Sequence, residues 1–171
     1  MKKFELTSEF NLNFFGRKFF RIKALVNIER YGVKAGDLGG WVEKEDNLSQ
    51  SGNAWVSSNA KVSGNAVVSG NAKVSGDAVV YGDAKVSGDA WVSGDADYAV
   101  IKGFGTVYRP TTFFRCHDGE ARVTCGCFYG TIDEFREQVK RTRKGKVADE
   151  YLKIADLMEY HFKEEDSGEN V

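Results

Sequence analysis

Eight hexapeptides follow one another without a gap from Ser51 to Tyr98, and they constrain the fold of this chain more than any other feature. They read SGNAWV SSNAKV SGNAVV SGNAKV SGDAVV YGDAKV SGDAWV SGDADY. In the first seven, Ala and Val stand two apart around a variable residue, the pattern of a short strand with one buried face. Ser-Gly-Asn or Ser-Gly-Asp favours a corner, because Gly, Asn and Asp tolerate positive φ. Each hexapeptide is therefore predicted to form one side and one corner of a coil.

A single side cannot bury its Ala and Val, so the coils must stack, as in other solenoids. With three sides per coil, the outward residues of successive coils fall into rows: Trp55, Lys73 and Trp91; Lys61, Val79 and Asp97; Val67 and Lys85. Because stacked strands are about 4.8 Å apart, Lys73 is expected to contact both tryptophans. Three interpretations of this Trp–Lys–Trp row stay open: a subunit interface, a platform for a partner or ligand, or contact with the terminal domains.

The repeat resembles that of hexapeptide-repeat proteins, whose loose pattern of aliphatic, small and free positions is met by Val-Ser-Gly-Asn-Ala-Lys and its neighbours. This resemblance implies a left-handed parallel β-helix, and commonly a homotrimer. Residues 19–98 contain Arg-Ile-Lys-Ala-Leu, Val-Lys-Ala-Gly-Asp-Leu-Gly-Gly-Trp-Val, Asn-Leu-Ser-Gln and Gly-Asn-Ala-Trp-Val. The combination is similar to a group of bacterial and bacteriophage proteins related to the YdcK-like and polymer-forming hexapeptide proteins. It implies a fold and a phage origin, and it carries no activity with it.

We therefore expect a mainly β fold: a β cap over residues 1–32, a left-handed parallel β-helix of about four to five coils over 33–110, and a hairpin with two helices over 111–171. In the cap, β-type residues between Phe10 and Ile28, around a turn at Gly16, predict a hairpin. The segment from Ala99 to Pro110 is predicted to be a degenerate closing coil, since an open end would expose strand edges.

The chain changes character after the repeat. The segment from Phe113 to Cys125 is typical of a hairpin, and its Asp118-Gly119 pair favours a two-residue type I′ turn. Thr131 and Glu134 predict a capping box at the start of a helix that buries Ile132, Phe135 and Val139. A second helix from about Val147 to Phe162 is predicted to bury Tyr151, Ile154, Leu157 or Met158, and His161. The polar tail from Glu164 to Val171 is expected to fray.

Two groups of residues in this C-terminal unit are candidates for chemistry. One has the residue types of a zinc site but lacks paired C-x-x-C loops, so that buried cysteines are the simpler interpretation and we expect no metal: Cys116, His117, Cys125 and Cys127. The other is a basic run with interleaved Glu and Asp, which is either a solvated helix face or a patch for phosphate or a partner: Arg136, Lys140, Arg141, Arg143, Lys144 and Lys146.

The resemblance also raises an alternative function, because acyltransferases and γ-class carbonic anhydrases share this fold. Acyltransferases of this kind use a His base between subunits, and these carbonic anhydrases use three His ligands to zinc. The repeat contains no His, and His117 and His161 both follow it. We therefore expect no catalytic residue and no cofactor, with an acyltransferase-like enzyme as the alternative.

The composition limits the kinds of partner that this chain is expected to bind. The 171 residues include 24 Lys and Arg against 25 Asp and Glu, so no net field attracts nucleic acid or a membrane. Glu5 and Glu9 interrupt the apolar stretch that a signal peptide would need. The odd number of cysteines is not typical of a secreted protein with a disulfide framework. We expect a cytoplasmic protein, in the host cytoplasm if phage-encoded. The functional hypothesis is a non-enzymatic, oligomeric binding or scaffold protein that binds a host protein or sequesters a nucleotide in an anti-defence role.

Overall fold

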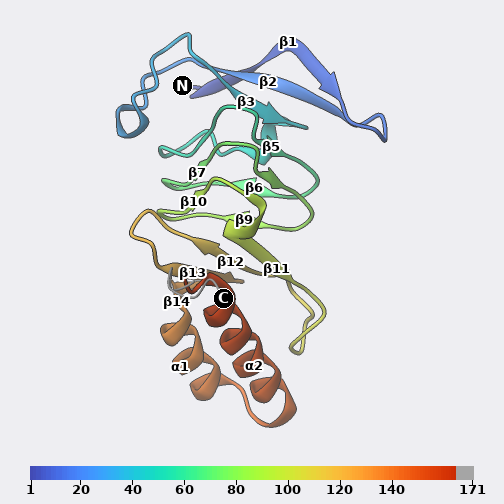
Figure 1. The fold of residues 1–171 in the computed structure, drawn as a ribbon, viewed down its shortest axis with the longest axis vertical. Coiled ribbons are helices and arrows are strands. Elements are labelled where there is room, and N and C mark those ends of the chain that lie inside the picture. The colour runs from blue at the N-terminus through green and yellow to red at the C-terminus, as the bar shows by residue number, and fades with distance from the viewer. Residues whose placement is uncertain (165–171) are drawn as a thin grey trace, which may run out of the picture.

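The computed structural model describes residues 1–164, and the predicted fraying of the tail lies outside these residues from 165 onward. The fold is mainly β with two helices. Seven two-residue strands carry the repeat: β4 (Trp55–Val56), β5 (Lys61–Val62), β6 (Val67–Val68), β7 (Lys73–Val74), β8 (Val79–Val80), β9 (Lys85–Val86) and β10 (Trp91–Val92). Figure 1 shows them as stacked loops in the middle of the molecule.

The short strands pair in parallel at the predicted spacing of three hexapeptides. Trp55 pairs with Lys73 and Lys73 with Trp91, while Lys61 pairs with Val79 and Val67 with Lys85. The parallel strands are thereby divided among three small ladders, β4-β7-β10, β5-β8 and β6-β9. The Ala at the fourth position and the Val at the sixth position of the first seven hexapeptides are at most 1% exposed, which confirms the predicted inward pattern.

The corners of the repeat are joined by side chains as well as by the backbone. The Asn59 amide donates to Asp77 at 3.1 Å, and Asn65 and Asn71 donate to Asp83 and Asp89 at the same distance. Because a carboxylate only accepts hydrogen bonds, an Asn row above an Asp row gives each corner one donor and one acceptor. The Asn53 amide makes the same bond to the Asn71 side-chain oxygen at 2.9 Å, so either residue serves as the acceptor.

A hairpin covers the N-terminal end of the stack, as the sequence predicts. Its strands are β1 (Phe4–Leu12) and β2 (Lys18–Ala24), and β2 pairs antiparallel with β3 (Leu38–Val42), which pairs in parallel with β5. Phe4 and Ile22 are fully buried in the same core as the repeat. Two single-turn 3₁₀ helices, Glu29–Tyr31 and Glu45–Asn47, complete this end. The tip of the hairpin extends beyond the side of the stack (Figure 1).

Side chains satisfy the backbone groups at the N-terminal edges of two ladders. β4 is the outermost strand of its ladder, and the buried Lys3 ammonium donates to the Ala54 carbonyl at 2.7 Å. The buried Asn47 amide likewise donates to the Ala66 carbonyl at 2.8 Å. An unpaired buried carbonyl is costly, so these two side chains stabilise the edges by supplying donors to the Ala54 and Ala66 carbonyls.

The opposite end of the stack is covered by an antiparallel sheet of β11 (Tyr98–Ile101), β12 (Thr111–Arg115), β13 (Ala121–Cys125) and β14 (Phe128–Thr131). The segment 99–110 is therefore not a closing coil, because β11 pairs antiparallel with β12. Asp97 also does not continue the predicted row of Lys61 and Val79. It lies in a 3₁₀ turn, Asp95–Asp97, where its carboxylate accepts from the Ser93 and Gly94 amides.

At the C-terminal edges of the ladders, side-chain hydroxyl and carboxylate groups hydrogen-bond to the backbone amides and carbonyls of the edge strands. The Lys85 amide donates to the Thr112 hydroxyl at 3.0 Å, and the Thr124 hydroxyl donates to the Lys85 carbonyl at 3.0 Å. At the next edge, the Val79 amide donates to Asp95 and the Tyr98 hydroxyl donates to the Val79 carbonyl. The antiparallel sheet thus replaces a coil without continuing the repeat.

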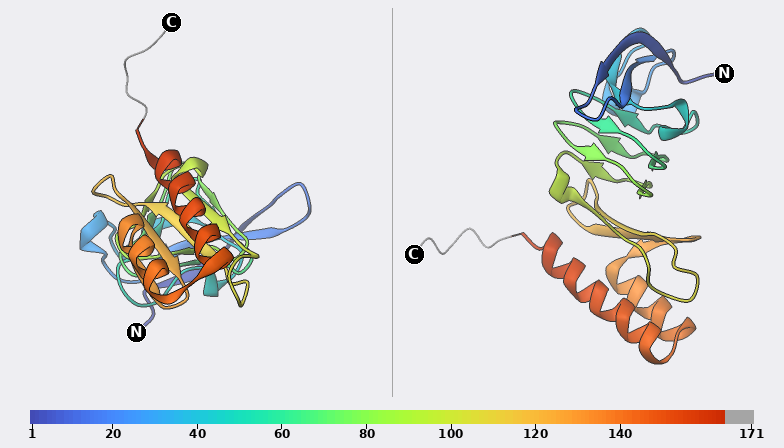
Figure 2. Two further views of the ribbon diagram at one scale, coloured as in Figure 1. Left: turned by 90° about the horizontal axis from the view of Figure 1, so that it is seen from below. Right: turned by 90° about the vertical axis from the view of Figure 1, so that its right-hand side faces the viewer.

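Two helices cover the outer face of this sheet, α1 (Ile132–Thr142) and α2 (Gly145–Phe162). Figure 2 shows the sheet between the stack and the helix pair. The capping box of α1 is confirmed, since the Glu134 amide donates to the Thr131 hydroxyl and the Thr131 amide donates to the Glu134 carboxylate. Ile132, Phe135 and Val139 are buried as predicted.

Two local predictions in this unit are wrong. The β12–β13 hairpin has a three-residue loop in which the Gly119 amide donates to the Cys116 carbonyl, and Gly119 has a φ of 84°. This is the longer loop class, in which a left-handed glycine follows the turn. On α2, His161 is exposed and not buried, while Met158 is the member of the Leu157–Met158 pair that is buried, together with Tyr151, Ile154, Ala155 and Phe162.

Among the described residues no helix combines the length and the apolar character needed to cross a bilayer.

Candidate functional site

The Trp–Lys–Trp row is aligned as predicted, but the ends of the chain cover it. Trp55 is only 2% exposed. The Lys73 ammonium lies 5.2 Å from the centre of the Trp91 ring and 5.3 Å from that of Tyr31, so its second aromatic partner is not Trp55. Of the three interpretations, contact with the terminal domains is the one that this geometry matches, and Trp55 is not available to a partner.

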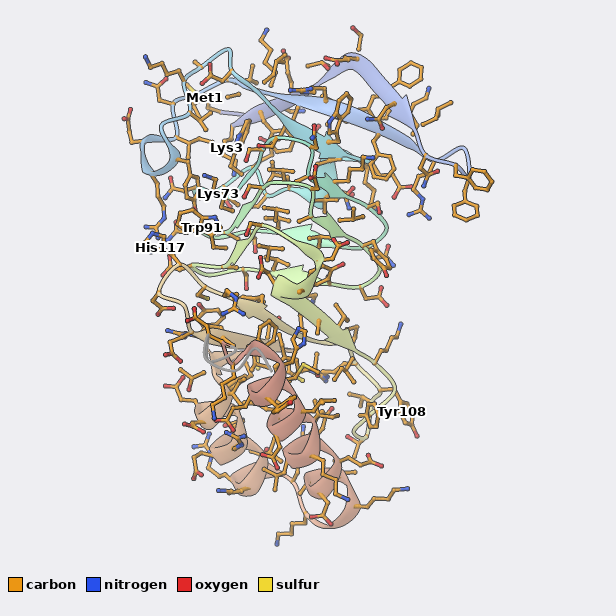
Figure 3. All side chains as sticks on the ribbon, in the orientation of Figure 1. Met1, Lys3, Lys73, Trp91, Tyr108 and His117 are labelled. Carbon is orange, nitrogen blue, oxygen red and sulfur yellow. The ribbon has the colours of Figure 1, made fainter. Side chains whose placement is uncertain are left out.

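His117 covers the Trp91 ring from the C-terminal side. Its ring stacks on Trp91 with the centroids 4.6 Å apart and the planes 18° from parallel, and its amide donates to the Asp89 carbonyl. Figure 3 labels Lys73, Trp91 and His117, which lie along one side of the stack. A two-residue turn at Asp118-Gly119 would put His117 at the end of the first strand of the hairpin. His117 lies instead in the β12–β13 loop, which brings it over the last tryptophan.

The four candidate zinc ligands do not come together. Cys116 is buried in the core of the stack, and burial raises the pKa of its thiol to about 11. Cys125 accepts a hydrogen bond from the Thr111 hydroxyl at 3.2 Å, Cys127 is exposed, and His117 lies on Trp91. Within residues 1–164, no group of three or more His, Cys, Asp or Glu side chains is arranged to hold a metal ion.

Acidic neighbours form ion pairs with three of the six residues in the basic run along α1 and just beyond it. Arg136 contacts Asp133, Asp156 and Glu159 at 2.7–2.8 Å, and the bond to Glu159 contributes most to raising its pKa. Lys140 pairs with Glu137 and Lys146 with Glu150, while Arg141 donates to Gln138. In the part of the chain that the structure describes, Arg141, Arg143 and Lys144 of this run have no carboxylate within 4.0 Å. The run is therefore not one continuous patch.

Arg143 lines a cavity of about 130 Å³ that the sequence analysis missed. We call it the Arg109–Arg143 cavity. Its walls come from the segment 106–109, the β13–β14 turn, the end of α1 and Tyr151 of α2. Phe128 and Phe135 form an apolar side, with their ring centres 5.6 Å apart, and Tyr151 packs edge-on against Phe135.

Arg109 reaches the cavity from the loop 102–110, which we call the flap loop. Gly103 and Gly105 have φ values of 96° and 78°, and the Tyr151 hydroxyl donates to the Phe104 carbonyl at 3.3 Å. The guanidinium lies so close to Gly126 that a Cβ there would overlap it. Glycine at 126 is therefore required both by its φ of 62° and by the position of Arg109.

The cavity was missed because its two arginines come from segments to which sequence reasoning gave other roles. The flap loop was assigned to the closing coil, and Arg143 was grouped with its neighbours in the basic run. The Gly-Phe-Gly-Thr-Val-Tyr-Arg-Pro sequence from Gly103 to Pro110 was the available signal, since it departs from the hexapeptide pattern and holds the single proline.

A second exposed feature is the tip of the β1–β2 hairpin, which we call the N-terminal arm (residues 10–18). Phe14 and Phe15 are 97% and 89% exposed, and Phe10 and Leu12 are about half exposed. The Lys18 ammonium lies 4.2 Å above the Phe10 ring. Contiguous exposed apolar side chains of this kind commonly mark an interaction surface.

No protein-family model matches this chain, and no curated protein matches its sequence.

Proposed function

We propose that this chain is a non-enzymatic, oligomeric binding scaffold whose repeat forms a left-handed parallel β-helix. In this proposal the helix is a rigid spacer, the N-terminal arm joins subunits, and the C-terminal unit carries the ligand site. The parallel pairing of Trp55, Lys73 and Trp91 and the inward Ala and Val support the solenoid. The observation that carries the oligomer is the exposure of Phe14 and Phe15 at the tip of the arm.

The proposed occupant of the arm is a second copy of this chain. The arm extends sideways past the outline of the stack in Figures 1 and 2, so its tip is placed to contact a molecule standing beside the stack. A neighbouring stack offers Val67 and Val79, which are half-buried on its outward rows. A closed ring of copies uses each arm once and leaves no arm unpaired, and the resemblance to hexapeptide-repeat proteins supports three as the number of copies.

The proposed biological setting follows from the resemblance of residues 19–98 to phage and bacterial proteins. There the scaffold is phage-encoded, acts in the host cytoplasm, and binds a host protein or sequesters a nucleotide in an anti-defence role. The unrepeated C-terminal unit supports a binding role at that end, because its cavity is not needed to close the stack.

Sedimentation equilibrium tests the oligomer. We expect the full chain to have three times its 19.0 kDa mass and the Phe14→Ser/Phe15→Ser variant to be a monomer with an unchanged circular dichroism spectrum. The matched control is Leu157→Ser/Tyr160→Ser, which removes exposed apolar side chains from α2 and should remain a trimer. A monomeric parent chain, or a trimeric arm variant, would contradict the proposal.

A further inference from the structure

The charge of the Arg109–Arg143 cavity is unbalanced. Twelve residues line it, and none of them is Asp or Glu. Neither Arg109 nor Arg143 has a carboxylate within 4.0 Å among residues 1–164, whereas Arg136 on α1 has three. Burial raises the pKa of the Tyr151 hydroxyl, and the positive charges of Arg143 and Arg109 both oppose that rise. Both guanidinium groups therefore act on the same small space.

The hydrogen-bond donors that remain are suited to an oxyanion. Arg143 uses one of its nitrogens on the Thr142 carbonyl at 3.2 Å, which leaves most of its donors unused in the described structure. A guanidinium group presents a planar fork of donors that matches two oxygens of a phosphate or carboxylate. The Tyr151 and Thr142 hydroxyls already donate to backbone carbonyls, so the arginines are the main source of specificity.

The size of the cavity selects among oxyanions. A volume of 130 Å³ corresponds to about four waters at ~30 Å³ each, which is enough for a single phosphate group. It is well below the ~300–1,000 Å³ of sites that enclose a drug-sized ligand. The rest of a larger ligand would therefore stay outside, beside Val107, which lines the cavity and is 60% exposed.

The backbone next to Arg109 is also unusual. Tyr108 has a φ of 53°, a left-handed conformation that bulky residues rarely hold. Such residues cluster at ligand sites, where the surrounding structure maintains the strain. Pro110 follows directly and fixes its own φ, so the flap loop holds the Arg109 side chain from a constrained segment.

We propose that the Arg109–Arg143 cavity binds a phosphate group, either free phosphate or the terminal phosphomonoester of a nucleotide. This inference rests on the proposed role of the C-terminal unit as the ligand-binding end. All the lining residues belong to one chain, so the site does not depend on the oligomeric state.

Isothermal titration calorimetry of the full chain tests the site with three probes: inorganic phosphate, AMP and acetate. We expect phosphate and AMP to bind at one site per chain and acetate to bind more weakly. Arg109→Gln and Arg143→Gln should each weaken binding about 10- to 100-fold, because each removes charge-assisted hydrogen bonds. The control Arg141→Gln changes an arginine of the same helix that contacts Gln138 and should bind normally.

The outcomes separate the sources of the phosphate group. Tighter binding of AMP than of phosphate assigns a nucleotide, and equal binding assigns the phosphate group alone. No heat with either anion, or unchanged affinity in both arginine variants, would overturn the site. Because a variant can lose binding by misfolding, alkylation of the exposed Cys127 at the cavity gives a second readout in the parent chain. Phosphate should slow that reaction, and an unchanged rate would count against the site.

These results are distinguishable from a failure of the scaffold proposal. A trimer that does not bind phosphate rejects the site alone, and a monomer that binds phosphate rejects the oligomer alone.

Discussion

Six glycines at the corners of the repeat have left-handed backbone, with φ between 61° and 71° at residues 52, 64, 70, 76, 82 and 88. Ser58 occupies the equivalent corner of the second hexapeptide with a φ of 57°, so the corner conformation persists without glycine. The conformation is therefore imposed by the stacking of the coils, and glycine lowers its cost. Neighbouring coils add a second requirement, because some corners lie against the backbone below them.

Three glycine-to-alanine variants separate these two requirements. Gly94→Ala should be nearly neutral, since Gly94 has extended backbone and open space around it. Gly82→Ala should cost about 1–2 kcal/mol, because its φ is 69° but its surroundings are open. Gly70→Ala should cost more, since its Cβ would lie 2.9 Å from the Gly88 amide nitrogen. Urea unfolding measures all three, and equal losses at residues 70 and 82 would show that inter-coil contact is unimportant.

At the scale of the elements, the recurring problem is the free edge of a short ladder. At the N-terminal end, the Lys3 and Asn47 side chains donate hydrogen bonds to the backbone carbonyls of the edge strands. At the other end, the hydroxyls of Thr112, Thr124 and Tyr98 hydrogen-bond to the edge backbone. Among these side chains Lys3 is the one whose charge is buried, and burial lowers the pKa of its ammonium to about 8. An ammonium held in this way must make the stability of the N-terminal end depend on pH.

The sign of that dependence follows from proton binding. Between pH 8 and about 10.5, the unfolded chain keeps the Lys3 proton while the folded chain loses it, so the free energy of unfolding should rise with pH. Relative to Lys3→Met, which lacks the group, we expect the parent chain to gain about 1–2 kcal/mol over this window. Denaturant unfolding at pH 7.5 and pH 10.5 measures the difference.

The control for this prediction is Lys2→Met. Lys2 is adjacent in sequence but exposed, and it pairs with Glu45. Its removal should leave the pH dependence of the parent chain intact. Parallel curves for the parent and Lys3→Met would show that Lys3 is not the titrating group.

At the scale of the whole molecule, strand β12 joins two hydrophobic cores. Phe114 belongs to the core of the stack, while its neighbour Phe113 belongs to the core beneath α1 and α2. Adjacent residues of a strand point to opposite faces, so one short strand packs against both cores. Figure 2 shows this arrangement, with the sheet between the coils and the helices.

Truncation of either phenylalanine should therefore affect more than its own core. Both are fully buried, and Phe→Ala typically costs about 3–5 kcal/mol. We expect Phe113→Ala and Phe114→Ala each to lower the midpoint of a single unfolding transition, seen alike by near-ultraviolet and far-ultraviolet circular dichroism. Two separated transitions in the parent chain would show instead that the two cores unfold independently.

The sequence predicts the repetitive part of the molecule better than its ends, for a physical reason. Ala54 and Val56 recur in register, so one hexapeptide predicts its neighbours, and the inward faces and the parallel pairing follow. The capping box at Thr131 and Glu134 is equally local. Arg109 and Arg143 come together only through tertiary packing, and no spacing between them signals it. The burial of Trp55 likewise depends on β3, whose Gly39 lies against the Trp55 ring, and no pattern within the repeat reveals this contact.

Parallel pairing every three hexapeptides also limits how the chain can vary in length. Removing residues 57–74 would join Val56 to Ser75 and leave every later strand in its own ladder, one coil shorter. Removing a single hexapeptide would move each later strand onto the next ladder and turn the Arg109–Arg143 cavity to a different side relative to the N-terminal arm. Insertions and deletions that preserve the mutual orientation of the two ends are therefore restricted to whole coils, so spacing and orientation can be altered separately.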